Sequence, residues 1–271
     1  MKISLYSLSI SDKNPEEVVR LAREYGCDGI EWWCKEGGHL DAGDLAVSSG
    51  KIAALMKNSG LKCCGLAPYF NFSETAGKLR PVFEAAKTIG AAVVRSHSYL
   101  FTGEISVSEL LAKQRRWLEE TVNPLLEEFS LKMVIEQHHY QICCTPNACR
   151  QLVEGLPEER FGVIFDPGNS LCEGYTRPEY ALSVLGRYLG HVHVKSCRPL
   201  EQGATIPFGR RYPVEWGSLA EGDLDWKAII EQLNKCGYQG FLSLEALDTR
   251  PSEHKLREDI SFLKGLISGS I

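Results

Sequence analysis

The sequence predicts an α/β protein that folds as a single (β/α)8 TIM barrel. Short apolar runs typical of strands alternate with stretches of helical periodicity about eight times along 271 residues. Gly26, Gly60, Gly90 and Gly237 each follow a helical stretch and precede a strand-like run, where left-handed helix caps are common. A doubly wound sheet would usually need fewer strands, so the repeated unit favours the barrel.

The predicted strands are brief apolar runs, which is typical of parallel strands buried on both faces. They cover residues 3–8, 29–33, 62–66, 92–96, 132–136, 162–166, 190–195 and 240–245. The predicted helices cover residues 15–25, 77–89, 107–128, 145–154, 177–185, 225–236 and 251–267. Several begin at recognisable start signals, namely Asn14-Pro15, Thr145-Pro146 and Ser252-Glu253.

Length and composition favour one domain spanning residues 1–271. The chain is 44% hydrophobic, which suits a large core, and no stretch rich in Pro, Gly and Ser separates two parts. The net charge of -5 would repel a polyphosphate backbone, so we expect no nucleic-acid partner. The first apolar run is too short for a secretory signal, and no run of about 18 apolar residues occurs. We therefore expect a cytoplasmic protein without a membrane span.

Metal-capable side chains stand at the ends of four predicted strands. The four runs are Met133-Val134-Ile135-Glu136, Val163-Ile164-Phe165-Asp166, His191-Val192-His193-Val194-Lys195 and Phe241-Leu242-Ser243-Leu244-Glu245. In a β/α barrel these ends meet at one face, where active sites lie. Three carboxylates and an imidazole can bind one divalent cation, which would compensate their buried charge. His191 and His193 share one face of the strand, so spacing alone leaves either as the imidazole ligand.

Five segments in order along the chain resemble the sugar phosphate isomerase/epimerase superfamily, whose members share a xylose-isomerase-like TIM barrel. They are Tyr25-Gly26-Cys27-Asp28-Gly29-Ile30-Glu31, Val134-Ile135-Glu136-Gln137-His138, Phe165-Asp166-Pro167-Gly168-Asn169, His191-Val192-His193-Val194-Lys195 and Leu242-Ser243-Leu244-Glu245. The resemblance implies one divalent metal ion held by Glu136, Asp166, His193 and Glu245. Manganese is the first expectation, with magnesium, cobalt or zinc as alternatives. The ketose 3-epimerase branch further implies Glu136 and Glu245 as a catalytic acid/base pair.

Further residues are expected to contact the substrate: Glu31, Trp33, His97, His138, Asn169, Lys195 and Arg198. Lys195 shares a strand face with His193 and could meet a substrate oxygen. His97 ends the fourth predicted strand, where it faces the pocket or serves as a hydrogen-bonded structural residue. Two positions depart from the family pattern, because Asn169 replaces a histidine and Ser196 replaces an aspartate. Arg198 lies about one residue from the position of the family's substrate-binding arginine.

The leading hypothesis is a metal-dependent isomerase or epimerase of a small keto sugar, sugar phosphate or cyclitol. Carboxylates would move the proton next to the carbonyl through an enediolate stabilised by the metal. Alternatives are a lyase resembling inosose or dehydroshikimate dehydratase, and a non-catalytic sugar-binding barrel subunit. A class II apurinic endonuclease is disfavoured by Asn169 and by the negative charge. The long segment 197–222 is expected to close over substrate or to form a subunit contact, and a homo-oligomer is left open.

Overall fold

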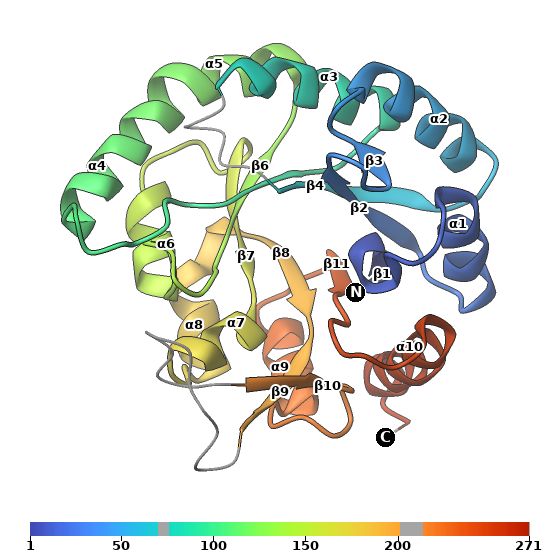
Figure 1. Cartoon of the computed structure of the whole chain (residues 1–271). Helices are drawn as coiled ribbons and strands as arrows, with labels where there is room; N and C mark the ends of the chain where they lie inside the picture. Colours follow the sequence, from blue (N-terminus) through green and yellow to red (C-terminus); the bar gives the residue numbers. More distant parts are fainter. Residues whose placement is uncertain (70–75, 201–213, 271) are drawn as a thin grey trace.

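Eight parallel strands close into a barrel within the residues that the structure, a computed structural model, describes: 1–69, 76–200 and 214–270. The barrel strands are β1 (Lys2–Tyr6), β2 (Gly29–Lys35), β4 (Lys62–Pro68), β5 (Val94–Ser96), β6 (Met133–Glu136), β7 (Phe161–Phe165), β8 (Leu189–Val194) and β11 (Phe241–Leu244). Neighbours pair in the order β1-β11-β8-β7-β6-β5-β4-β2, and β1 pairs with β2 to close the ring (Figure 1). The predicted fold class is confirmed, whereas the assignment of residues 1–271 to one domain stays a prediction.

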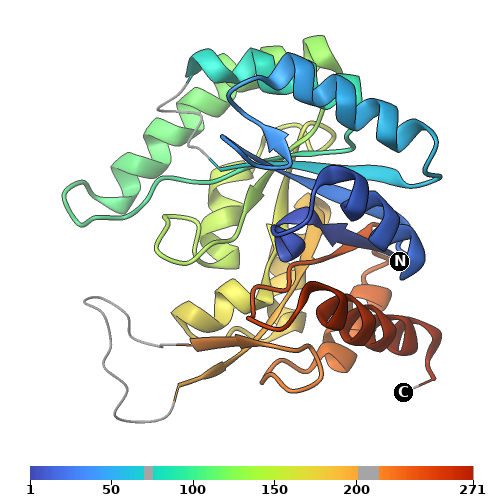
Figure 2. The same ribbon diagram turned by 45° about the vertical axis from the view of Figure 1, so that its right-hand side comes forward.

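Helices surround the barrel on the outside (Figure 1). They are α1 (Pro15–Glu24), α2 (Leu45–Lys57), α3 (Leu79–Ile89), α4 (Val107–Trp117), α5 (Asn123–Phe129), α6 (Pro146–Val153), α7 (Pro167–Glu173), α8 (Pro178–Leu185), α9 (Trp226–Lys235) and α10 (Ser252–Ser268), with the short turns η1 (Ser7–Ile10), η2 (Ala76–Lys78), η3 (Leu118–Val122) and η4 (Gly186–Tyr188). Strand β3 (Leu40–Asp41) pairs in parallel with the end of β2, while β9 (Ser196–Pro199) and β10 (Val214–Gly217) form an antiparallel hairpin. Figure 2 shows this hairpin projecting from the barrel beside α7. Among the described helices, none combines the length and apolar character needed to cross a membrane.

Two of the three predicted helix start signals form side-chain caps, whereas Ser252 is the first residue of α10, and Pro251 before it provides no side-chain cap. Asn14 accepts a hydrogen bond from the backbone N–H of Glu17 at 2.9 Å, and the Glu17 carboxylate accepts one from the N–H of Asn14 at 3.0 Å. This reciprocal capping box satisfies backbone donors that a helix N-terminus otherwise leaves unpaired. Thr145 caps α6 by accepting from the N–H of Ala148.

Some elements differ from the prediction for local physical reasons. Helix α2 has no counterpart among the predicted helices, because Ser48, Ser49 and Gly50 interrupt its apolar periodicity. The helix predicted over 107–128 is divided into α4, the π-helical turn η3 and α5. Pro124 stands at the start of α5 and lacks an N–H, so the regular hydrogen-bond ladder cannot continue through it. Helix α7 was also not predicted, and it begins directly after Asp166.

The inside of the barrel is layered, with apolar side chains beneath charged ones. Val134 and Glu136 are two residues apart on β6, and Ile164 and Asp166 are two apart at the end of β7, so each pair shares a face. Val134 and Ile164 join Val93 in a small buried apolar cluster that is separate from the main core. Glu136 and Asp166 lie at the carboxyl ends of the strands, where a β/α barrel carries its active site.

His39, which lies between β2 and β3, is a buried histidine whose packing can be tested through the pH dependence of stability. Its Nε2 donates to the carbonyl of Lys13 at 2.8 Å, its ring lies edge-on to Trp32 and Trp33, and its Nδ1 is buried without a described partner. Burial lowers the pKa of His39, whereas an unfolded histidine titrates near a pH of about 6.5. Below that pH the unfolded chain binds a proton that the folded chain does not, so stability falls with falling pH.

We expect the free energy of unfolding to decrease from about pH 7 to about pH 5.5, with His39 contributing up to about 1 kcal/mol of that loss. His39→Gln cannot titrate and should lose correspondingly less over the same range. Urea unfolding of both proteins at the two pH values measures this difference. Parallel pH profiles for the parent and the variant would contradict the assignment.

Candidate metal centre

Four side chains from four neighbouring barrel strands converge at the carboxyl ends. Glu136 ends β6, Asp166 follows β7, His193 lies on β8 and Glu245 follows β11, and each is at most 2% exposed. Their ligand atoms lie within 4.8 Å of one another. The Nδ1 atom of His193 is 3.3 Å from Glu136 Oε1, 3.6 Å from Asp166 Oδ2 and 3.5 Å from Glu245 Oε2.

The environment of His193 fits a cation between these atoms. Its Nδ1 is buried and has no hydrogen-bond partner among the described residues, although three carboxylate oxygens face it. Burial alone would lower the pKa of His193, but Glu31 and the surrounding carboxylates raise it well above its ordinary value. The raised pKa favours an extra proton on the imidazole. A divalent cation would replace this proton, because an imidazole that binds a metal must be neutral. One nitrogen and three carboxylate oxygens form a donor set suited to such a cation.

Glu31 lies beneath the cluster and fixes the orientation of the imidazole. It accepts hydrogen bonds from His191 Nε2 at 3.1 Å, His193 Nε2 at 3.2 Å and Ser243 Oγ at 2.6 Å. With Nε2 of His193 donating to Glu31, the lone pair of Nδ1 points at the carboxylates. Of the two histidines that spacing left open, His193 is therefore the one among the carboxylates, and His191 lies below. Both oxygens of Glu31 already accept hydrogen bonds from protein side chains. Glu31 is therefore better placed to position His193 than to make the substrate contact that the sequence predicts.

Lys195 forms ion pairs with two of the carboxylates. Its Nζ donates to Asp166 Oδ2 at 2.8 Å and to Glu245 Oε2 at 2.7 Å, and it lies 5.3 Å from the ring centre of Trp216 on β10. Burial alone would lower the pKa of Lys195, but Asp166 and then Glu245 raise it. Burial raises the pKa of Glu245, and the charge of Lys195 opposes that shift without cancelling it.

Asn169, in the first turn of α7, donates hydrogen bonds to two side chains of the cluster. Its Nδ2 donates to Asp166 Oδ2 at 2.8 Å, to the carbonyl of Gln137 at 3.1 Å and to Glu136 Oε1 at 3.3 Å. Its backbone N–H donates to Asp166 Oδ1 at 2.8 Å, so Asp166 also caps the helix. This residue replaces the histidine of the family pattern and contacts two members of the cluster.

Arg95 is a central residue of the site that the sequence reasoning missed. Its Nη1 donates to Glu136 Oε2 at 3.0 Å and its Nη2 donates to the carbonyl of Pro68 at 3.0 Å, with 1% of the residue exposed. Burial would raise the pKa of Glu136, but Arg95 and then His193 and His97 hold it well below its usual range. The available signal was a single arginine inside an otherwise apolar strand-like run, since a buried charge requires a partner.

Aromatic and imidazole rings line one side of the cluster. The chain of ring contacts runs Trp33 to Tyr69, Tyr69 to His97, His97 to His138, and His138 to His139. His97 Nε2 also contacts Glu136 Oε2 at 3.0 Å. Burial lowers the pKa of His138 to about 4, so this ring is neutral near neutral pH. These residues form a wall of rings beside Glu136.

Arg198 lies apart from the other predicted substrate contacts. Its side chain is 55% exposed on β9 and pairs with Glu215 across the hairpin at 3.5 Å. Phe208, Arg210, Arg211 and Tyr212, which belong to the long segment expected to close over substrate, lie outside the described residues. The structure therefore gathers Glu31, His97, His138, Asn169 and Lys195 around the cluster, places Trp33 on the aromatic wall, and leaves Arg198 on the hairpin.

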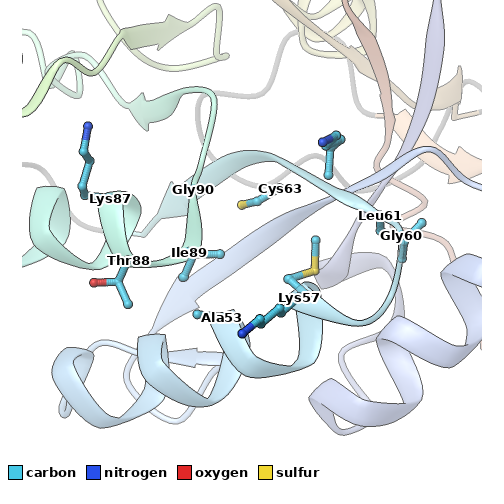
Figure 3. Close-up of a pocket in the computed structure, with 11 residues that line it drawn as sticks. Ala53, Lys57, Gly60, Leu61, Cys63, Lys87, Thr88, Ile89 and Gly90 are labelled. Carbon is cyan, nitrogen blue, oxygen red and sulfur yellow. The ribbon is translucent and has the colours of Figure 1, made fainter.

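A pocket of about 570 Å³ lies at the opposite end of the barrel (Figure 3). It is lined by the ends of α2 and α3 and by the start of β4, with Lys57, Lys62 and Lys87 around it. Lys57 and Lys87 stand in the last turns of their helices, where a cation interacts favourably with the helix dipole. Their place in the fold therefore explains Lys57 and Lys87, and the pocket contains no member of the cluster.

This fold agrees with comparison to known proteins. The chain belongs to the xylose isomerase-like TIM barrel family, which it matches over residues 19–266. An inosose dehydratase of Clostridium perfringens is 27% identical over 158 residues, which cover 54% of this chain and 51% of that protein. The chain thus spans about half the length of the curated relatives it matches.

Two solved structures show how closely the barrel is shared. The IOLI protein with a bound zinc atom has a TM-score of 0.80 at 17% identity, with 99% of this chain and 97% of that chain covered. A D-tagatose 3-epimerase-like protein has a TM-score of 0.77 at 19% identity, with 100% of both chains covered. At these identities the likeness concerns the fold.

Proposed function

We propose that the chain is a divalent-metal-dependent isomerase or epimerase that moves the proton next to the carbonyl of a small keto sugar, sugar phosphate or cyclitol. The observation that carries this proposal is the convergence of three carboxylate oxygens on the buried, unpartnered Nδ1 of His193. Lys195 and Arg95 offset part of this negative charge, and a divalent cation between the oxygens and Nδ1 would offset the rest. Four intact ligand side chains also argue against a barrel that only binds a sugar.

Manganese is our first assignment for the metal, with magnesium, cobalt or zinc as alternatives. A set of three carboxylates and one imidazole suits this range of cations, and the zinc atom of the IOLI structure supports a divalent ion in such a barrel. A cation bound there would polarise the substrate carbonyl and stabilise the negative charge that develops on it.

The side chains of this site supply the remaining functions. Glu136 and Glu245 are the proposed acid/base candidates, Lys195 and Asn169 keep the carboxylates oriented, and Trp33 and His138 would contact the sugar ring. Dehydration is the second candidate reaction, because the inosose dehydratase relative is a lyase by name and loss of a β-hydroxyl begins with the same proton removal. The first step is thus common to both candidates.

The test uses purified protein loaded with Mn²⁺ in D2O against ketoses, ketose phosphates, inososes and dehydroshikimate, with products followed by proton NMR and mass spectrometry. We expect deuterium to enter a substrate whose carbon skeleton is unchanged; loss of water would instead identify a lyase. Glu245→Gln should lower the rate by at least about 100-fold because it removes a carboxylate base. The matched control Glu221→Gln, on the described surface, should retain the parental rate.

Two results, if both are obtained, would refute the proposal. One is the absence of deuterium exchange with every compound of the panel. The other is a Glu245→Gln protein that binds Mn²⁺ as tightly as the parent does, since Glu245 is proposed as a ligand.

A further inference from the structure

The two glutamates of the cluster have different surroundings. Both oxygens of Glu136 are engaged: Oε2 accepts from Arg95 Nη1 and His97 Nε2, each at 3.0 Å, and Oε1 accepts from Asn169 Nδ2 at 3.3 Å and lies 3.3 Å from the unpartnered Nδ1 of His193. A carboxylate receives a substrate proton on an oxygen lone pair, so Oε2, which is held by two donors, offers no direct place for it, and Oε1 is turned toward the proposed metal position.

Glu245 has one oxygen available. Its Oε2 accepts from Lys195 Nζ at 2.7 Å and lies 3.5 Å from His193 Nδ1. Within residues 1–69, 76–200 and 214–270, no donor contacts its Oε1. Asp166 offers no comparable position, because the backbone of Asn169 occupies Oδ1 while Lys195 and the Asn169 side chain occupy Oδ2. Glu245 Oε1 is therefore the free carboxylate oxygen of the cluster.

Arg95 fixes the position of the Glu136 carboxylate. The guanidinium is buried, is fixed on its other side by the Pro68 carbonyl, and lies 4.4 Å from the ring centre of Tyr69 and 5.8 Å from that of Tyr6. An arginine does not release its proton in proteins. Moving Glu136 away from Arg95 would leave a buried charge without its partner, which is strongly unfavourable.

We propose that Arg95 withholds Glu136 from proton transfer, so that Glu245 Oε1 alone exchanges a proton with the substrate, on one face of it. This inference rests on the proposed function and narrows it. It selects isomerisation or dehydration over epimerisation, because epimerisation through a planar intermediate needs a proton donor on the opposite face as well. Arg95 is a positioning residue in this scheme, since it acts through Glu136.

The chemical steps balance with one base. The bond between carbon and hydrogen next to the carbonyl breaks, its proton passes to Glu245 Oε1, and its electron pair forms a carbon–carbon double bond while the carbonyl pair moves onto oxygen. In isomerisation Glu245 returns the proton to the adjacent carbon, and the hydroxyl proton passes to the former carbonyl oxygen. In dehydration the pair on the enolate oxygen re-forms the carbonyl, the double bond moves to the α and β carbons, and the β-hydroxyl departs with its bonding pair and takes the proton from Glu245, which releases water. Neither route requires an oxidant or a reductant.

The test compares the parent with Arg95→Met and Arg95→Lys, each loaded with Mn²⁺ in D2O and supplied with the substrate that exchanges in the panel. The parent should place deuterium on a single face and form no epimer. Arg95→Met leaves His97 as the one described donor to Glu136 Oε2, so an epimer should appear at a level at least about tenfold above the parent's background. Arg95→Lys keeps a cation at this position and should retain the single-face product. An epimer formed by the parent would overturn the inference, whereas no exchange at all in the parent would overturn the proposed function beneath it.

Metal affinity gives a readout that does not depend on turnover. Removing a cation that lies 3.0 Å from a ligand carboxylate should tighten Mn²⁺ binding to Arg95→Met, by about three- to tenfold. Arg95→Lys should bind Mn²⁺ as the parent does. Unchanged affinity together with unchanged stereochemistry in Arg95→Met would reduce Arg95 to a structural residue and overturn the inference. If Arg95→Met does not fold, the stereochemistry of the parent product decides the matter alone.

Discussion

Replacing Lys195 with methionine is expected to lower the free energy of unfolding of the metal-free protein by about 3 to 5 kcal/mol, the usual cost of removing one partner from a buried ion pair. Lys195 Nζ lies 2.8 Å from Asp166 Oδ2 and 2.7 Å from Glu245 Oε2, and all three side chains are at most 3% exposed. The variant therefore leaves two buried carboxylates facing each other without their shared cation. Urea unfolding in the presence of EDTA measures the loss.

Saturation with Mn²⁺ should recover much of this loss, because the metal supplies positive charge to the same two carboxylates. Lys62→Met is the matched control, since Lys62 is exposed at the start of β4, and it should change stability by less than about 0.5 kcal/mol with or without metal. An equal loss for Lys195→Met in EDTA and in Mn²⁺ would show that the metal does not share these carboxylates.

The second large effect is expected for Asp166→Asn, which should remove most of the stabilisation that the metal gives the folded protein. If the Kd of the parent for Mn²⁺ is about 1,000 times lower than the Mn²⁺ concentration used, the metal stabilises the folded parent by about 4 kcal/mol. Asparagine keeps the capping contact with the backbone N–H of Asn169, so the start of α7 should survive while the charged ligand is lost. Calorimetric melting with Mn²⁺ and with EDTA measures the difference in Tm.

The control for this experiment is Asp28→Asn. Asp28 accepts a hydrogen bond from the backbone N–H of Ile3 at 2.8 Å near the amino ends of β1 and β2, away from the cluster. That variant should lose some stability and retain the full increase in Tm on addition of Mn²⁺. A parental metal response in Asp166→Asn would exclude Asp166 from the ligand set.

The fold was predictable from the sequence because its signals are local. Apolar runs mark the buried parallel strands, and caps such as Asn14 mark the helix starts, so alternation along the chain was enough to specify a barrel. Helix α2 could not be predicted in this way, because Ser48, Ser49 and Gly50 weaken its periodicity and packing against its neighbours compensates for that weakness.

The candidate ligands were also accessible to sequence reasoning, but their contacts were not. Glu136, Asp166 and Glu245 each end an apolar run, and the topology of a barrel brings such ends together. The position of Arg95 on Glu136 depends on β5 lying beside β6, and the same guanidinium must reach the carbonyl of Pro68 on β4. No spacing along the chain encodes which carboxylate oxygen a buried arginine will meet.

The sequence by itself determined the barrel and the four chain positions at which a metal could be held, since hydrophobic periodicity and strand ends are properties of neighbouring residues. Spacing left His191 and His193 open and the family resemblance favoured His193, since both point to the same face of β8; the tertiary structure shows that His193 is the one among the carboxylates. Glu31, which arrives from β2, contacts both rings from below and leaves Nδ1 of His193 facing the carboxylates. The same long-range packing distinguished Glu136 from Glu245, because hydrogen bonds from distant strands occupy one of them fully and leave the other an open oxygen among the described residues.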